Sequence, residues 1–202
     1  DRVHWGALRV WNDDTIQPGT GFPPHPHADM EIITYVREGA ITHQDSLGNK
    51  GRTVAGDVQV MSAGTGIRHA EYNLEPGVTR IFQIWIFPDR QGEAPAWGTR
   101  PFPKDGRSGR FVALASGIEG DDDALPIRTN ARVLGATLKA GESAEYAFAG
   151  PGRYGYLVAD RGRVEVDGVA LEPRDGAAIS GQDRLRVTAI EDAELVLVDT
   201  AG

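Results

Sequence analysis

Short runs of residues that favour β-strands, separated by glycine and proline, constrain the fold of this chain more than any other feature. The 202 residues include 26 Gly and 12 Pro, spread along the whole chain. Between them lie segments rich in Val, Ile, Tyr and Thr, such as "EIITYV" at 31–36 and "ELVLVD" at 194–199. No long stretch repeats apolar residues at the helical period. The pattern predicts an all-β fold with few, short helices.

The two halves of the chain carry a faint repeat. "YVREGAITH" at 35–43 resembles "VADRGRVEV" at 158–166, with Gly39 and Gly162 at the same place between two strand-like runs. The stretch at 88–109 is rich in Pro, Gly and charged residues and lacks alternation, which is typical of a connector. We therefore predict two similar domains, residues 1–108 and 109–202.

Composition excludes several classes of function. Cysteine is absent, so disulfides, thiolate nucleophiles and Cys-ligated zinc are excluded. The net charge is −8 without a basic cluster, which argues against nucleic acid as a partner. No apolar run is long enough to span a membrane, and no segment resembles a signal peptide, so we expect a cytoplasmic protein. Dinucleotide-binding, Walker and serine-hydrolase motifs are also absent.

Histidines are confined to the first part of the chain. All five lie within the first 69 residues, so only the first domain can hold a histidine-rich site. His25 and His27 form "HPH", and residues two apart in a strand point to the same face. Pro24 and Pro26 stiffen the backbone and remove two amide donors, which favours an edge strand.

A second histidine pattern completes a metal-binding set. His69 and Glu71 again stand two residues apart, so one face offers an imidazole and a carboxylate. If the two strands meet, His25, His27, His69 and Glu71 gather around one divalent ion, for which iron, nickel, copper, manganese and zinc are all suitable. Four ligands leave open positions for water, dioxygen or a chelating substrate.

Three other residues could belong to the surroundings of this site. Glu31 is either a fifth ligand or, as we favour, a residue that packs beside the ligands or hydrogen-bonds to them. His43 has no partner two residues away, so we expect a hydrogen-bonded interior residue rather than a ligand. We expect His4 to be peripheral.

These residues resemble the motifs of a known superfamily. The spacing G-x5-H-x-H-x3-E, met by Gly19, His25, His27 and Glu31, resembles the first motif of the cupins. The second cupin motif is met more loosely, by Gly56, Gly64, His69 and Asn73.

A narrower resemblance covers residues 19–87. "HPHADMEIITYVREGAITHQDSLGNKG" followed by "GDVQVMSAGTGIRHAEYN" resembles the pirin family, and within it the bacterial proteins described as quercetin 2,3-dioxygenases. The resemblance implies a bicupin, with two antiparallel, jelly-roll-like β-barrels and a metal, iron above all, only in the first. It places the ligands at His25, His27, His69 and Glu71, although the commoner cupin carboxylate ligand stands at the Glu31 position.

The function that follows from this resemblance is oxygenative opening of a flavonol ring. The substrates would be a small aromatic, quercetin-like molecule and O2, and Glu71 would be ligand and general base together. An alternative is a non-catalytic, iron-binding redox sensor whose metal alters a surface recognised by a protein partner. A third is a cupin isomerase or a structural cupin without activity.

Overall fold

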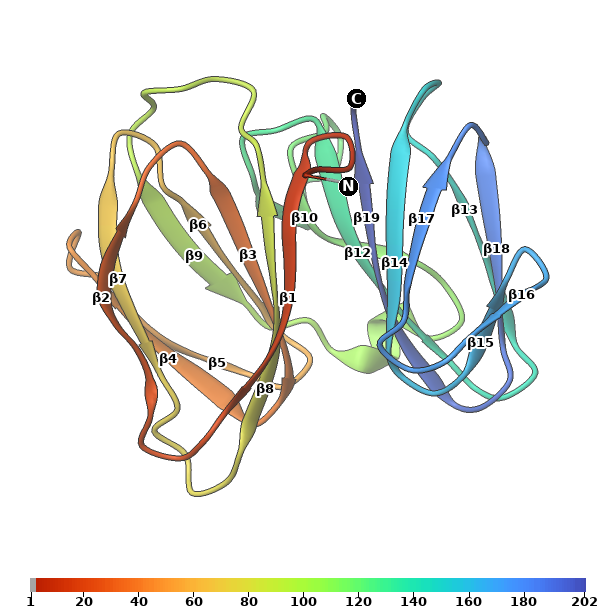
Figure 1. The fold of residues 1–202 in the computed structure, drawn as a ribbon, viewed down its shortest axis with the longest axis horizontal. Helices are drawn as coiled ribbons and strands as arrows, with labels where there is room; N and C mark the ends of the chain where they lie inside the picture. Colours follow the sequence, from red (N-terminus) through yellow and green to blue (C-terminus); the bar gives the residue numbers. More distant parts are fainter. Residues whose placement is uncertain (1–2) are drawn as a thin grey trace. The chain divides into compact units, whose positions relative to one another are not determined.

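The computed structural model describes residues 3–202 and forms two compact units (Figure 1). The amino-terminal unit comprises Leu8–Phe102 and Leu125–Thr129. The carboxy-terminal unit comprises the described residues up to Ala7, together with Pro103–Ala124 and Asn130–Gly202. Each unit is described by itself.

The amino-terminal unit consists of two antiparallel sheets that face one another (Figure 1). One sheet has the order β1-β8-β3-β6-β9, with the strands Leu8–Ile16, Thr79–Ile86, Glu31–Glu38, Val58–Ser62 and Ala96–Arg100. The other, the histidine sheet, has the order β2-β7-β4-β5, with the strands Gly21–His27, Ile67–Tyr72, Ala40–Asp45 and Lys50–Val54. The short strand β11 (Leu125–Pro126) also belongs to this unit.

The carboxy-terminal unit repeats this plan. In its larger sheet β10-β12-β19-β14-β17 are successive neighbours, with the strands Val112–Ser116, Ala131–Leu138, Ala193–Thr200, Tyr154–Arg161 and Gly176–Ser180. Its smaller sheet has the order β13-β18-β15-β16, with the strands Ser143–Ala147, Arg184–Ala189, Val164–Val166 and Val169–Leu171. A single 3-10 turn, η1 (Lys104–Arg107), is the only helix among the described residues.

The predicted all-β fold is confirmed, and each predicted barrel takes the form of two facing sheets. Within the described residues, no helix is long and apolar enough to cross a membrane. One local prediction was wrong, because the expected connector at 88–109 contains β9. β9 lies at the edge of its sheet, with β6 as its neighbour. An edge strand does not need alternating apolar and polar residues, so the sequence pattern did not reveal it.

Two glycines make the repeat visible in the structure. Gly39 joins β3 to β4 and Gly162 joins β14 to β15, both with φ near +80° (75° and 84°). A Cβ on Gly162 would lie 2.2 Å from the Asp192 carbonyl oxygen, and one on Gly39 would lie 2.6 Å from Thr79 Oγ1. Only glycine combines this backbone conformation with so little space.

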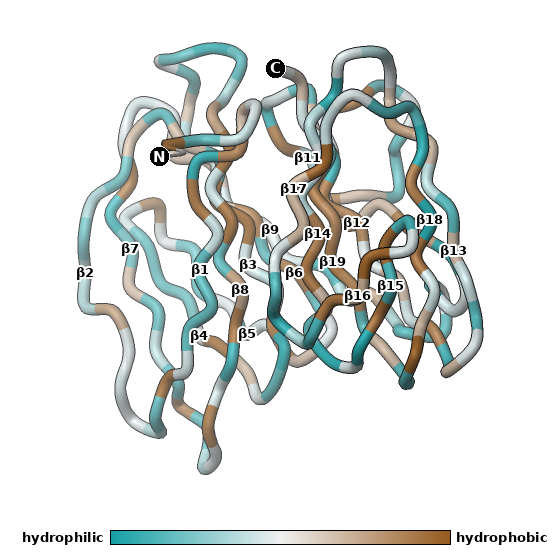
Figure 2. Tube along the Cα trace, turned by 45° about the vertical axis from the view of Figure 1, so that its right-hand side comes forward, coloured by the Kyte–Doolittle hydropathy of each residue, from teal (hydrophilic) through white to brown (hydrophobic). Residues whose placement is uncertain are grey.

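The strands of the two units differ in hydropathy, because β2, β4 and β7 are largely hydrophilic whereas β12 and β19 are largely hydrophobic (Figure 2). A large apolar cluster lies in the carboxy-terminal unit. The amino-terminal unit includes two smaller clusters, made by Ile16, Val36, Ile41 and Ile81 and by Ile32, Met61, Ala63 and Ile67, and further buried apolar side chains of its larger sheet lie outside them. Buried polar side chains of the histidine sheet, His43, His69 and Glu71, lie in the same interior.

The predicted division at residues 108 and 109 differs from the two units in three segments. Trp5 donates its indole N–H to the Gly155 carbonyl at 2.9 Å, so the first described residues pack with the carboxy-terminal unit. Gly109 N–H bonds to the Thr137 carbonyl in that unit, which holds the end of the segment that begins at Pro103. Leu125–Thr129 belongs to the amino-terminal unit because its backbone bonds to Glu31 and Asp89.

The stacking of His43 on Trp97 leads to a first prediction. Their rings lie 4.7 Å apart and 9° from parallel, and Gly51 stands opposite His43 in β5. A Cβ on Gly51 would lie 2.4 Å from Trp97 Cη2, so Gly51→Ala must displace the indole. We expect a loss of about 1–3 kcal/mol in the free energy of unfolding, measured in urea by tryptophan fluorescence.

Gly77→Ala is the matched control, because a Cβ there meets no atom within 4 Å. It should leave stability nearly unchanged. Equal urea midpoints for the two variants would contradict the packing described here.

Candidate metal centre

The edge strand β2 brings the two histidine patterns together. β2 pairs with β7 so that His25 lies opposite His69 and His27 opposite Ile67. Between Phe22 and His25 the register shifts, because β2 has one more residue than β7 over this interval. Pro23 and Pro24 have no N–H to give to a ladder, which suits a bulged edge. The prediction of an edge or irregular strand at "HPH" is confirmed.

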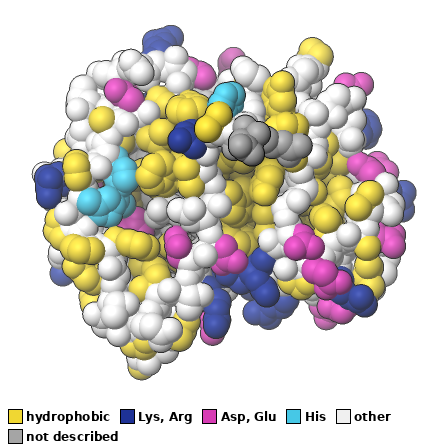
Figure 3. Space-filling model, in the orientation of Figure 1, with side chains coloured by type: hydrophobic (Ala, Val, Ile, Leu, Met, Phe, Trp, Pro, Cys, Tyr) yellow, Lys and Arg dark blue, Asp and Glu magenta, His cyan; other side chains and the backbone are white. Residues whose placement is uncertain are grey.

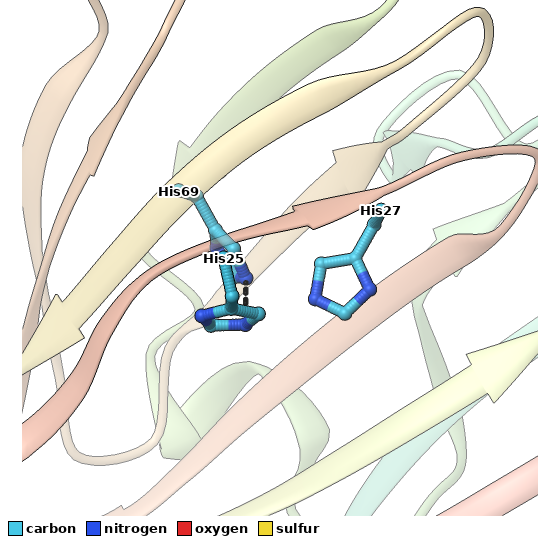
Figure 4. A group of neighbouring side chains, drawn as sticks. All are labelled: His25, His27 and His69. Atoms are coloured by element: carbon cyan, nitrogen blue, oxygen red, sulfur yellow. Dashed lines mark hydrogen bonds between the residues drawn. The ribbon is translucent and has the colours of Figure 1, made fainter.

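Three imidazoles converge at this edge (Figure 4). Nε2 of His25 and Nε2 of His69 lie 3.0 Å apart. The ring of His27 lies 4.8 Å from that of His25 and 5.0 Å from that of His69. One nitrogen of each ring lies within 4.8 Å of the other two. Three of the four predicted ligands are therefore neighbours.

The nitrogen geometry fits a transition metal. Two imidazole nitrogens that each bind an ion at about 2.1 Å, at a right angle, stand about 3.0 Å apart. His25 Nδ1 lies 2.7 Å from the Pro23 carbonyl oxygen, which can only accept a hydrogen bond. Nδ1 of His25 therefore carries the proton and Nε2 carries the lone pair that a metal needs.

Two of the imidazoles lie where the neutral form is favoured. Burial, together with the neighbouring His25, His27 and His43, lowers the pKa of His69 to about 3. Burial also lowers the pKa of His27, with a contribution from His25. Metal ions bind only unprotonated imidazole, so these groups need to lose no proton when an ion enters.

Glu71 lies on the other side of His69. Its Oε1 is 3.3 Å from His69 Nδ1, the nitrogen that faces away from His25, and its Oε2 is 3.5 Å from Gln83 Nε2. Glu71 thus forms a second group with His43 and His69 rather than joining the three imidazoles. Burial raises the pKa of Glu71 to about 7, and the charge of Asp14 adds to the rise.

Glu31 lies outside both groups. Its carboxylate accepts hydrogen bonds from Ser62 Oγ at 2.8 Å and from the Arg128 backbone N–H at 2.6 Å. Burial raises the pKa of Glu31, although these two bonds lower it in part. Strand β2 ends at His27 and β3 begins at Glu31, and Asp29 between them has a φ of 47°. Glu31 therefore does not continue the face of the histidines.

The other two histidines take the positions expected for them. His43 is fully buried and bonds to Asp45 at 2.7 Å, and His4 is exposed in the carboxy-terminal unit. The premise that His43 has no partner two residues away was wrong, because Asp45 stands at that distance and bonds to it, and sequence reasoning missed Asp45 as a residue of the site. The available signal was its place two residues after His43, at the start of the "SLGN" turn.

The site opens to the surface. His25 and His27 are half-buried, and histidine side chains are visible in Figure 3 over β2 and β7. A pocket of about 520 Å³ reaches one of these histidines; its lining residues are Pro26, His27, Ala28, Ser46, Gly66, Ile67 and Arg68. Strand alternation places Pro26 and Arg68 on the outer face, so the pocket lies at the rim of the histidine sheet.

Comparison with known families agrees with this geometry. Residues 1–86 match the Pirin family, and residues 113–200 match the quercetinase C-terminal cupin domain. A pirin-like protein of Caulobacter vibrioides is 72% identical over 201 residues, which cover 100% of this chain and 86% of that one. This chain belongs to the pirin family.

Two further pirin relatives bear on the site. The quercetin 2,3-dioxygenase of Escherichia coli K12 is 40% identical over 198 residues, 96% of this chain and 83% of that one. The crystal structure of bacterial pirin YhhW from Escherichia coli in complex with nickel(II) matches with a TM-score of 0.89 and 38% identity. The match covers 98% of this chain and 84% of that one. Pirins are metal-binding cupins, and the donor set of this pirin fits such an ion.

Metal loading should stabilise this pirin. With nickel(II) at about 100 times its dissociation constant, binding adds about 2.7 kcal/mol, which raises Tm by about 5–10 °C over protein treated with EDTA. His69→Ala should abolish the difference, and the exposed His4→Ala should retain it. Differential scanning calorimetry checks both; a full nickel effect in His69→Ala would contradict the site.

Glu31 should serve structure rather than metal binding. Glu31→Ala leaves the Arg128 N–H without its acceptor, so we expect a loss of about 1–3 kcal/mol in urea unfolding. Nickel affinity, measured by titration calorimetry, should not change. Glu31→Gln keeps an acceptor oxygen and is the matched control. A tenfold weaker affinity in both variants would instead make Glu31 a ligand.

Proposed function

We propose that this pirin is a metal-dependent dioxygenase that opens the heterocycle of a flavonol, such as quercetin, with O2. The observation that carries the proposal is the convergence of His25, His27 and His69 at an edge open to a pocket. The 40% identical relative called quercetin 2,3-dioxygenase supports the choice of substrate.

The proposed ligands are His25, His27, His69 and Glu71, and the choice of metal follows from their chemistry. Three neutral nitrogens and one carboxylate suit several divalent metals, of which we favour iron; the nickel(II) complex of YhhW shows that a related pirin binds another. When bound, the metal would act as a Lewis acid that makes a hydroxyl group of the substrate more acidic.

The chain itself supplies the proton acceptor. Burial raises the pKa of Glu71 to about 7, so near neutral pH its carboxyl group can both accept and return a proton. We assign Glu71 to accept the proton of the flavonol 3-hydroxyl and to complete the ligand set. Its side chain now rests beside His69 Nδ1, on the inner side of the imidazole group.

The pocket is large enough for a small aromatic substrate. Its volume of about 520 Å³ is within the range of small-molecule sites. Pro26, Ala28 and Ile67 provide apolar surface against aromatic rings, and the ring of Trp85 lies 5.2 Å from that of His27. The alternative of a non-catalytic redox sensor expects a metal closed off from solvent. Half-buried ligands beside a pocket support the enzyme instead.

Removal of Glu71 should separate metal binding from catalysis. We expect Glu71→Ala, loaded with iron, to lose at least about 100-fold in turnover of quercetin, because it lacks the proton acceptor. Loss of the flavonol absorption band under air, with release of carbon monoxide, is the measurement.

Glu75→Ala is the matched control, since this glutamate pairs with Arg52 on the surface. It should turn over quercetin normally. Normal turnover by metal-loaded Glu71→Ala would contradict the assignment of Glu71 as the proton acceptor. If the unsubstituted protein consumes no flavonol with any of the metals named, the redox-sensing alternative is favoured.

A further inference from the structure

The buried pair His43–Asp45 has no part in the chemistry proposed so far. His43 Nε2 lies 2.7 Å from Asp45 Oδ2, and both side chains are fully buried. Asp45 Oδ1 accepts the backbone N–H groups of Leu47 and Asn49 at 2.9 and 3.1 Å. The Asn49 amide donates to both oxygens of the carboxylate. Four contacts from one turn, together with the contact to His43, therefore fix the position of this carboxylate.

These contacts settle which nitrogen of His43 carries the proton. Both carboxylate oxygens of Asp45 accept N–H groups of the turn, Oδ1 from the backbone of Leu47 and Asn49 and Oδ2 from the side-chain amide of Asn49. This set of donors on both oxygens suits the ionised carboxylate. An ionised carboxylate can only accept a hydrogen bond. Nε2 of His43 is thus the donor, and Nδ1 is left with a lone pair.

The ring of His43 lies beside the metal centre. The ring of His43 is held flat against Trp97 and lies 5.5 Å from the ring of His69. One ligand atom from each of His43, His69 and Glu71 lies within 4.8 Å of the other two. Nδ1 of His43 is buried and makes no hydrogen bond within the part of the chain that the structure describes.

A proton on Nδ1 of His69 needs a hydrogen-bond acceptor on the side of Glu71 and His43. If His69 holds the ion through Nε2, the nitrogen that faces His25, its neutral ring carries a proton on Nδ1. Nδ1 of His69 is also buried without a hydrogen bond to any described residue. Glu71 Oε1 lies 3.3 Å away, and His43 is the other acceptor nearby. A buried N–H without a partner is costly.

The second group is not a second metal site while the first is filled. A neutral imidazole has one lone pair, so His69 cannot hold an ion on each side. The atoms of the group instead suit a hydrogen bond that orients a metal ligand, as partners of metal-bound histidines commonly do.

We propose that His43 is a positioning residue of the metal centre. Its Nδ1, kept as an acceptor by Asp45, takes the Nδ1–H of His69 when His69 holds the ion. Glu71 is then released from His69 and is available to the ion or the substrate. The inference rests on the metal site proposed above and is independent of the flavonol.

Asp45→Asn tests the proposal with almost no change of shape. The backbone N–H groups of Leu47 and Asn49 would hold the amide oxygen of the new asparagine at the place of Oδ1. Its NH2 group would then take the place of Oδ2 and face His43. Nε2 of His43 must then accept, and its proton moves to Nδ1, where it opposes the N–H of His69. We expect nickel(II) affinity to fall about 10- to 100-fold in titration calorimetry without flavonol.

A second series changes the acceptor itself. His43→Leu removes the acceptor and should weaken nickel binding similarly, whereas His43→Gln offers an amide oxygen and should recover part of the affinity. Gln44→Ala, the neighbour on the outer face of β4, is the control and should bind nickel normally. The Tm of each metal-free variant shows whether affinity changes without loss of structure.

Exchange of the His69 Nδ1–H with solvent supplies a spectroscopic measure. In cobalt(II)-loaded protein the paramagnetic ion shifts this proton out of the main NMR envelope. We expect slow exchange in the unsubstituted protein and in Gln44→Ala, and fast exchange in Asp45→Asn.

Two outcomes would overturn the proposal. In the first, Asp45→Asn binds nickel as tightly as the unsubstituted protein and retains slow exchange. In the second, affinity falls equally in His43→Gln and His43→Leu, in step with the metal-free Tm, which would indicate a purely structural role. If His43→Leu does not fold, Asp45→Asn still decides. Failure to consume quercetin would leave both measurements unaffected.

Discussion

The antiparallel pairing of β2 with β7 is the constraint on which the candidate metal centre depends. It places His25 directly opposite His69, and the alternation of strand residues then brings His27 to the same side. A slip by one residue would turn every histidine of β2 to the opposite face. The proline-containing bulge before His25 therefore helps to determine which side chains of β2 face the candidate metal centre, because it shifts the register at the edge of the sheet.

A polar interior distinguishes the amino-terminal unit from its repeat. The carboxy-terminal unit fills the equivalent space with a continuous apolar cluster, and its Phe148 stands where the repeat would place His25. Buried His43, His69 and Glu71 interrupt the apolar packing of the amino-terminal unit. Such groups are tolerated only when they are hydrogen-bonded or bind an ion. The same scaffold thus encloses a large apolar cluster in one unit and a group of buried polar side chains in the other.

Local periodicity was enough to predict much of this arrangement. The all-β fold, the hairpins at Gly39 and Gly162, and the shared face of His25 and His27 follow from spacing along single strands. Their approach to His69 was predicted on the condition that the two strands meet, and the pairing of β2 with β7 meets that condition. The position of Glu71 relative to the imidazoles did not follow, because side-chain torsions decide on which side of His69 the carboxylate rests. Nor could spacing show that the chain turns at Asp29 and sends Glu31 to another sheet. There Glu31 accepts a hydrogen bond from the backbone N–H of Arg128, a residue 97 positions away.

The contact between Glu31 and Arg128 has a consequence for how this protein is made. The amino-terminal unit includes Leu125–Thr129, so its sequence is discontinuous. A ribosome that has released residues up to Phe102 has not yet supplied the N–H that Glu31 needs. The unit therefore becomes complete only after the intervening segment Pro103–Ala124 has emerged. The last contact that Glu31 makes within its own unit therefore forms only after residues that carry none of the proposed ligands have been synthesised.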